Sequence, residues 1–161
     1  MTDSERQALL ETYRTAPARL AAAIDTLRPE EIDGRPSAED WTVREIVHHL
    51  ADAEIISAAR LRAILHEDNP SLVAFDEAGY ARRFDYGERP FAGALALLTT
   101  VRQSNVEIME RMAPDEWERA GDHPEYGRYT IARLLETHAP HAPAHIRQIE
   151  ANRDALRAGS A

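Results

Sequence analysis

Cysteine and lysine are both absent from this chain of 161 residues. The absence of cysteine excludes disulfides, a thiolate nucleophile and the sulfur-ligated structural zinc sites. The absence of lysine excludes Schiff-base chemistry and a lysine phosphate cradle, because all nineteen basic residues are arginine. Because the chain has no cysteine, any metal bound here must have nitrogen and oxygen ligands.

Positive charge and long apolar runs are also scarce. The formal net charge is −9 and the pI is near 5.2, which argues against nucleic acid as a partner because neutralising phosphates needs a basic face. No run approaches the ~20 apolar residues of a membrane span, and the first fourteen residues lack the apolar core of a signal peptide. We therefore expect a cytoplasmic protein that binds neither nucleic acid nor a membrane.

Apolar residues recur with helical spacing along most of the chain, and no strand pattern or internal repeat is visible. Thr42 and Glu45 form a capping box at the start of the second helix, and Thr130 is placed to cap the fourth. A short helical turn is expected at Pro29 to Ile32. The four predicted long helices span residues 4–27, 43–66, 90–112 and 131–156.

Three prolines lie inside predicted helices. Pro17 predicts a kink or a restart of the first helix near Ala16, because proline removes one backbone hydrogen bond and crowds the preceding turn. Pro140 and Pro143 lie in the fourth helix, where each costs roughly 3 kcal/mol in a straight interior. Either the fourth helix breaks there or it bends and the bundle holds it. We expect the bend, because the apolar pattern continues across both prolines.

The connections between the helices indicate the topology. The link between the first two helices is short, whereas residues 67–90 mix turn formers with aromatic side chains and show no periodicity. A connection this long is usually functional or partly helical, and we expect it to cross over one end of the bundle. The predicted fold is an all-α four-helix bundle with a long crossover between helices two and three, in a single domain of residues 1–161.

Three histidines are candidate metal ligands. His141 and His145 stand four residues apart in the last helix, so both imidazoles project from one face with Cβ atoms roughly 6 Å apart. His49 shares the apolar face of the second helix with Ile46 and Ala53 and can supply a third ligand. A helical histidine pair is also typical of a surface or of a hydrogen-bonded core. Three neutral imidazoles plus water would form the open site that metal catalysis uses.

Other polar residues near these histidines allow more than one interpretation. Asp52 is placed to orient an imidazole or to lie in solvent, and His138 to line the pocket mouth or face solvent. His48 points about 100° from His49 and is expected in solvent or at a helix contact. His66 and His123 lie in or beside loops and are expected to be incidental. No general base is evident, so the catalytic residues beyond the candidate ligands are unknown.

Two motifs make a family resemblance visible. WTVREIVHHLADAE, from Trp41 to Glu54, and HAPAHIRQIE, from His141 to Glu150, resemble the DinB superfamily and in particular its YfiT-like branch of metal-dependent hydrolases. The resemblance extends to HEDNPSLVAFDE after the second helix and to the DHPEYG loop before the fourth, and so covers most of the chain. Relatives often have further histidines between the last pair, where this chain has Ala142, Pro143 and Ala144.

The resemblance implies a four-helix bundle with one divalent metal ion per chain, zinc or nickel. By position, its ligands would be His49, His141 and His145. The implied functions are hydrolysis of a small molecule by metal-activated water and, as an alternative, transfer of a low-molecular-weight thiol such as bacillithiol or mycothiol. A non-catalytic metal-binding or interaction bundle is the third possibility. A cavity large enough for a thiol and its acceptor favours transfer, a narrow one favours water attack, and a filled one favours a structural role.

A homodimer is also expected. Relatives are commonly dimers, and the helix faces leave some apolar residues without an obvious place in a single bundle core. These residues are Leu10, Leu95 and Met109.

Overall fold

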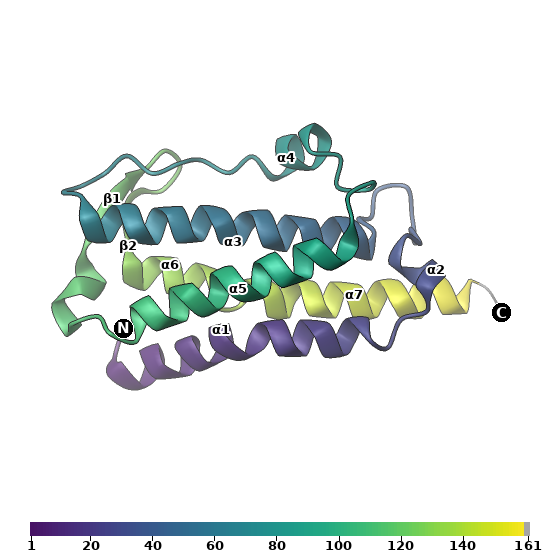
Figure 1. Ribbon diagram of the computed structural model, residues 1–161, viewed down its shortest axis with the longest axis horizontal. Coiled ribbons are helices and arrows are strands. Elements are labelled where there is room, and N and C mark those ends of the chain that lie inside the picture. The colour runs from purple at the N-terminus through teal and green to yellow at the C-terminus, as the bar shows by residue number, and fades with distance from the viewer. Residues whose placement is uncertain (160–161) are drawn as a thin grey trace.

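The computed structural model describes residues 1–159, and its long helices form a four-helix bundle (Figure 1). The four positions of the bundle are taken by α1 (Asp3–Ile24), α3 (Val43–His66), α5 (Phe91–Met109), and α6 (Ile131–His138) followed by α7 (His141–Ala158). This arrangement confirms the predicted fold class. The domain limits of 1–161 stay a prediction, and residues 160 and 161 lie outside the described residues.

Neighbouring helices α3 and α5 run in the same direction, while α1 and the α6–α7 pair run in the opposite direction (Figure 1). Around the bundle, α3 packs on α5, α5 on α1, and α1 on α7, which closes the ring against α3. Because α3 and α5 are parallel, the chain between them returns along the whole length of α3. The prediction that it crosses one end of the bundle is wrong, whereas its partly helical character is confirmed by α4 (Glu77–Arg83).

Local signals set the helix starts. The Thr42 hydroxyl accepts a hydrogen bond from the Glu45 amide at 3.2 Å, and the Thr42 amide donates to the Glu45 carboxylate at 2.7 Å, so the predicted capping box is present. The Thr130 hydroxyl caps α6 by accepting from the Arg133 amide at 3.0 Å. The short helix α2 (Pro29–Ile32) lies where it was expected. Helix α1 continues through Pro17 without restarting.

A β-hairpin precedes the last helices, and the expectation of no strands is wrong. After the short 3-10 helix η1 (Pro114–Glu118), strand β1 (Ala120–His123) pairs antiparallel with β2 (Gly127–Thr130). The strand sequences AGDH and GRYT do not alternate apolar with polar residues, so they gave no strand signal. A Cβ on Gly121 would lie 2.7 Å from both the Leu72 side chain and the Pro70 carbonyl, so glycine allows the crossover segment to pack against the hairpin.

The last helix breaks at its prolines, so the expected bend is wrong and the alternative is correct. Helix α6 ends at His138, and α7 begins at His141. Backbone hydrogen bonding across this point resumes with the Ala144 amide, which donates to the Pro140 carbonyl at 3.0 Å. Pro143 lies in the first turn of α7, where an amide has no intrahelical partner, so proline is tolerated there.

Two apolar clusters form the core, with polar side chains between them along α3. One cluster includes Leu50 and the other Leu61, and Glu54 and Ser57 are buried in the interval. Met109 is only 2% exposed in the second cluster, so the argument that it needs a partner subunit is wrong. Leu10 and Leu95 are partly buried and pack against the same core.

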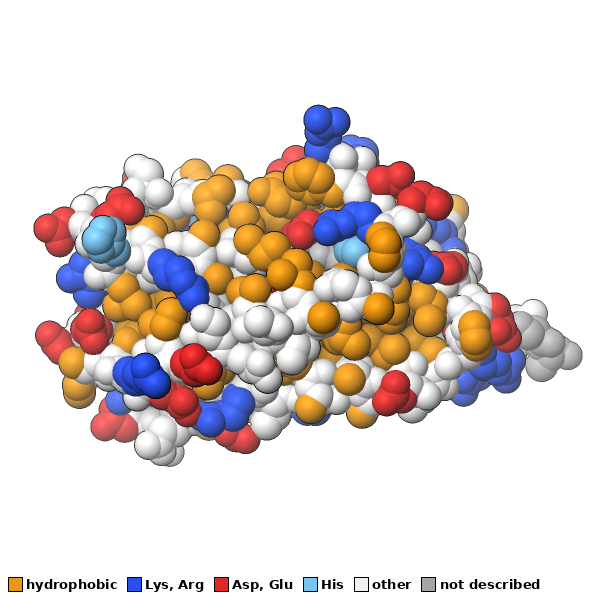
Figure 2. Space-filling model, viewed as in Figure 1, with side chains coloured by type: hydrophobic (Ala, Val, Ile, Leu, Met, Phe, Trp, Pro, Cys, Tyr) orange, Lys and Arg blue, Asp and Glu red, His pale blue; other side chains and the backbone are white. Residues whose placement is uncertain are grey.

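The described surface combines charged ends with apolar areas. Figure 2 shows apolar side chains gathered below α4, with charged side chains concentrated toward both ends of the molecule. Ile55 on α3 and Phe84 after α4 are 41% and 48% exposed. None of the described helices is long and apolar enough to cross a membrane.

Candidate metal centre

Three imidazoles converge at the break between α6 and α7. His141 and His145 lie in the first two turns of α7, and His49 faces them from α3. The Nε2 atom of His141 lies 3.1 Å from Nε2 of His49 and 3.2 Å from Nε2 of His145, and one ligand atom from each residue lies within 4.8 Å of the others. The structure thus brings together the three histidines that helical spacing selected.

The geometry of this cluster fits a tetrahedral metal ion. Zinc–nitrogen bonds of 2.0–2.1 Å place two imidazole nitrogens of a tetrahedral site about 3.3 Å apart, close to the two separations that join His141 to His49 and to His145. Nδ1 of His145 lies 2.8 Å from Oε1 of Gln148. Since the amide oxygen accepts only, Nδ1 carries the proton, and the Nε2 lone pair of His145 is directed at the cluster.

Burial keeps two of the three imidazoles neutral. The pKa of His49 and that of His141 are each lowered to about 3, first by burial and then by the positive charge that neighbouring histidines would add. A metal ligand must be an unprotonated imidazole, so this environment leaves the nitrogen lone pairs free at neutral pH.

Aromatic rings enclose His49. Trp41, just before α3, meets it edge-on with ring centroids 5.1 Å apart, and Phe75 from the crossover segment stacks on it at 5.7 Å. His49 is buried beneath these contacts, with only 1% of it exposed. Trp41 belongs to the motif before His49, but Phe75 lies in a loop without periodicity, and its position depends on how that loop returns along α3.

A cavity of about 180 Å³ opens beside His141. Its lining combines histidines, aromatic rings, two carboxylates and one arginine, and includes His138, His123, Arg60, Phe75, Tyr126, Tyr129, Glu77 and Glu125. The sequence did not single out Arg60, Glu77 or Glu125 for a role, because no local signal distinguishes them from solvated charges. Gln148 was also missed, although its position three residues after His145 is the available signal.

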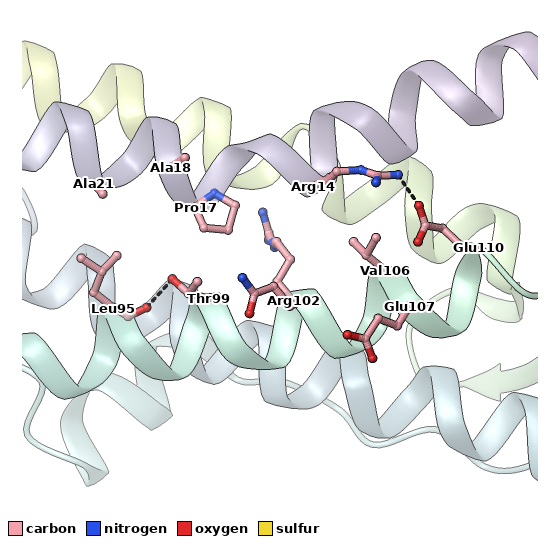
Figure 3. Close-up of a pocket in the computed structure, with 11 residues that line it drawn as sticks. Arg14, Pro17, Ala18, Ala21, Leu95, Thr99, Arg102, Val106, Glu107 and Glu110 are labelled. Atoms are coloured by element: carbon pink, nitrogen blue, oxygen red, sulfur yellow. Dashed lines mark hydrogen bonds and ion pairs between the residues drawn. The ribbon is translucent and has the colours of Figure 1, made fainter.

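A larger cavity of about 570 Å³ lies on the other side of the molecule's core, between α1 and α5 (Figure 3). It is a groove lined by Pro17, Ala18, Leu95 and Val106, with the Arg14–Glu110 ion pair near one end. None of the described residues that line this groove is a histidine, so the groove lacks a metal-binding or acid–base imidazole. The smaller cavity at His141 is therefore the candidate site.

The histidines outside the cluster differ in their burial and contacts. His138 is buried and lines the cavity, which matches the interpretation that it lines the pocket. His123 is also buried in the cavity lining, whereas His66 is exposed. His48 is buried and stacks on Tyr86, which places it at a packing contact and not in solvent.

Asp52 matches neither of its interpretations. It accepts a hydrogen bond from the Tyr86 hydroxyl at 2.7 Å and pairs with Arg89 at 3.4 Å. Within the described residues no hydrogen bond joins it to an imidazole. Asp52 therefore fixes the end of the crossover segment and does not orient a candidate ligand.

Comparison with known proteins agrees with this arrangement. The family model of the DinB superfamily matches residues 12–149. OB0782 of Oceanobacillus iheyensis is 29% identical over 133 residues, covering 83% of this chain and 77% of its own, and YfiT of Bacillus subtilis is 25% identical over 150 residues, covering 92% and 84%. Both carry the name "Putative metal-dependent hydrolase".

A solved structure shares the fold. The structure of YfiT from Bacillus subtilis, described as having an unusual four-helix bundle topology, superimposes with a TM-score of 0.88 at 24% identity. The match covers 99% of this chain and 90% of the YfiT chain.

Proposed function

This chain belongs to the DinB superfamily, and from that premise we propose that it is a metal-dependent hydrolase whose divalent ion is held by His49, His141 and His145. The observation that carries the proposal is the convergence of three imidazole Nε2 atoms at separations suited to one ion. The names of the relatives OB0782 and YfiT support the assignment. Imidazole ligands suit zinc and nickel, the two metals we propose.

The residues around the cluster have separate tasks in this proposal. A bound divalent ion would supply Lewis acidity, which lowers the pKa of water to about 7 in tri-imidazole zinc sites. Gln148 holds the His145 ring by its Nδ1 proton, and Phe75 covers His49 from solvent. Glu77 and Glu125 are the two carboxylates lining the cavity and are the candidates for a general base.

Cavity size favours hydrolysis over thiol transfer. The cavity of about 180 Å³ is close to the roughly 150 Å³ that holds benzene, and it falls below the ~300 Å³ lower limit of pockets for drug-sized ligands. A small-molecule substrate fits this space, whereas a bacillithiol or mycothiol cosubstrate together with its acceptor does not. An open cavity also disfavours the non-catalytic bundle, whose site would be filled.

Metal content tests the ligand assignment directly. Protein loaded with zinc or nickel and then desalted is expected to retain about one ion per chain by elemental analysis, and His141→Ala is expected to lose most of it. His66→Ala is the matched control, because His66 is exposed at the end of α3 and lies outside the cluster. Equal metal content in His141→Ala and wild type would contradict the assignment.

An omission experiment tests the reaction. Metal-loaded protein is expected to hydrolyse small esters or amides with no thiol present, and activity is expected to fall with metal content in His49→Ala. A strict requirement for added thiol would replace the hydrolase proposal with the S-transferase alternative. Metal binding without turnover of any substrate in either condition would favour the non-catalytic bundle.

A homodimer is part of the same proposal. Two observations support it: Figure 2 shows an apolar area below α4, and the exposed residues Ile55 and Phe84 line one surface pocket together with Tyr80 of α4. Light scattering at tens of micromolar distinguishes the dimer from a monomer of 18.1 kDa.

A further inference from the structure

Arg60 is a buried cation without a counter-ion. It lies on α3 and is only 7% exposed, and its Nε and Nη2 both donate to the Val73 carbonyl, at 3.0 and 2.6 Å. No carboxylate of the described residues lies within ion-pair distance of its guanidinium. A neutral carbonyl satisfies two of its donors but leaves the charge uncompensated.

The other deeply buried arginine shows how this chain ordinarily compensates such a charge. Arg102, 1% exposed on α5, donates from Nε and Nη2 to Glu54 at 2.9 and 2.6 Å. Figure 3 shows its side chain extending from α5 into the space toward α1. Buried charges are normally paired in this way, because removal from water is strongly unfavourable for a lone ion. The unpaired Arg60 therefore needs a different explanation.

Arg60 lines the cavity that opens beside His141. The carboxylates that share this lining, Glu77 and Glu125, belong to exposed residues. Burial lowers the pKa of Arg60, and Tyr129 and Glu125 oppose this shift through space. Negative charge from the protein is thus confined to the exposed part of the cavity, and the buried part has a cation.

His123 adds a second donor to the same lining. Its Nδ1 accepts a hydrogen bond from the Glu125 amide at 3.2 Å, so the proton of the neutral ring lies on Nε2. That Nε2 is buried and has no partner within the described part of the chain. Burial and the nearby charge of Arg60 both lower the pKa of His123 and keep it neutral. The buried part of the cavity lining therefore has the positive charge of Arg60 beside a His123 donor that has no acceptor among the described residues.

We propose that Arg60 binds a carboxylate of the substrate, so that the enzyme acts on small esters or amides bearing a free carboxylate. This inference rests on the proposed function and specifies its substrate class. The carboxylate would supply the missing counter-charge of Arg60, while the bond to be hydrolysed lies toward His141. Both groups must fit about 180 Å³, which limits the acyl portion to a few carbon atoms.

The test compares two ligands that differ in one charge. Monomethyl succinate carries a carboxylate and an ester, and dimethyl succinate is its neutral counterpart. Binding of each to zinc-loaded protein is measured by calorimetry, and release of methanol is followed in parallel. We expect the charged ligand to bind at least tenfold tighter, the order of magnitude of a charge-assisted hydrogen-bonded pair.

Variants of Arg60 test whether this residue causes the preference for the charged ligand. Arg60→Gln is expected to reduce the affinity ratio of the two ligands to near one, and Arg60→Lys to keep part of it. Arg62→Gln is the matched control on the same helix, since Arg62 bonds to Asn105 and Ser104 and does not line the cavity. An unchanged ratio in folded Arg60→Gln would show that the carboxylate binds elsewhere, for example on the metal, and would overturn the proposal.

Different results would overturn the hydrolase function and the role of Arg60. Methanol release at equal rates and affinities for both ligands in wild type overturns the role of Arg60 and leaves the hydrolase function intact. A charge preference that depends on Arg60, without methanol release, supports the anion site and counts against hydrolysis. If Arg60→Gln does not fold, Arg60→Lys decides the matter: a reduced affinity ratio supports the role of Arg60, and an unchanged ratio overturns it.

Discussion

The ring of His145 is held at both of its nitrogen atoms. Nδ1 donates to Gln148, one turn further along α7, while Nε2 faces His141 at 3.2 Å. Metal-binding histidines are commonly oriented by such a contact, because it fixes both the tautomer and the plane of the ring. Gln148 is thus a positioning residue and does not itself belong to the cluster of candidate ligands.

Removing this support is expected to weaken metal binding without abolishing it. Gln148→Ala should lower zinc affinity by about 10- to 100-fold in a chelator competition assay, while Gln148→Glu, which keeps an acceptor, should restore most of it. Gln103→Ala, in the groove between α1 and α5, is the control and should not change the affinity. Equal zinc affinity in wild type and Gln148→Ala would show that the contact has no such role.

Among the helices, the break between α6 and α7 determines how the candidate ligands are presented. It places His141 at the start of α7 and His145 one turn later, opposite His49 on α3. His138, the last residue of α6, lines the cavity beside them. The interruption thus lets the end of α6 and the start of α7 contribute side chains to one site.

A proline substitution distinguishes the break from a strained continuous helix. Pro143→Ala should leave the free energy of unfolding unchanged or lower it by about 1 kcal/mol through lost packing, because an amide at this position has no helical partner. In a continuous helix the same change would add roughly 3 kcal/mol.

Ala144→Pro is the matched control for this prediction. The Ala144 amide donates to Pro140, so proline there should lower the free energy of unfolding by roughly 3 kcal/mol. Urea denaturation measures both variants. A clear gain in stability for Pro143→Ala would show that α6 and α7 behave as one strained helix.

For the molecule as a whole, buried imidazoles make stability depend on pH. The pKa values of His49, His138 and His141 are each lowered to about 3, with burial as the main cause. In the unfolded chain these side chains titrate near 6.5. Between these values the unfolded state binds more protons than the folded state, so stability rises with pH and is lost as the pH falls.

Metal-free protein should therefore lose stability between pH 6.5 and pH 3. Each of the three histidines should contribute about 1.4 kcal/mol per pH unit in this range, and urea midpoints at pH 7, 6 and 5 measure the sum. His138→Asn should reduce the slope by one such contribution. A midpoint independent of pH in this range would contradict the buried, neutral state of these rings.

The sequence alone determined most of the helices and the identity of the converging histidines. Capping at Thr42 and Thr130 and the spacing of apolar residues are local signals, so they predicted where α3 and α6 begin. The same helical period placed His141 and His145 on one face and His49 on a buried face. The groups in each of these relations are at most four positions apart in the sequence, so no knowledge of packing was needed to place them on a face of their own helix.

Only the tertiary structure decided how distant segments meet. The parallel course of α3 and α5 brings Phe75 over His49, and the hairpin brings His123 into the cavity with Arg60. The lack of a counter-ion for Arg60 is likewise a property of the packed molecule. Such contacts depend on the burial of apolar surface shared by several segments, and no local periodicity encodes which of them become neighbours.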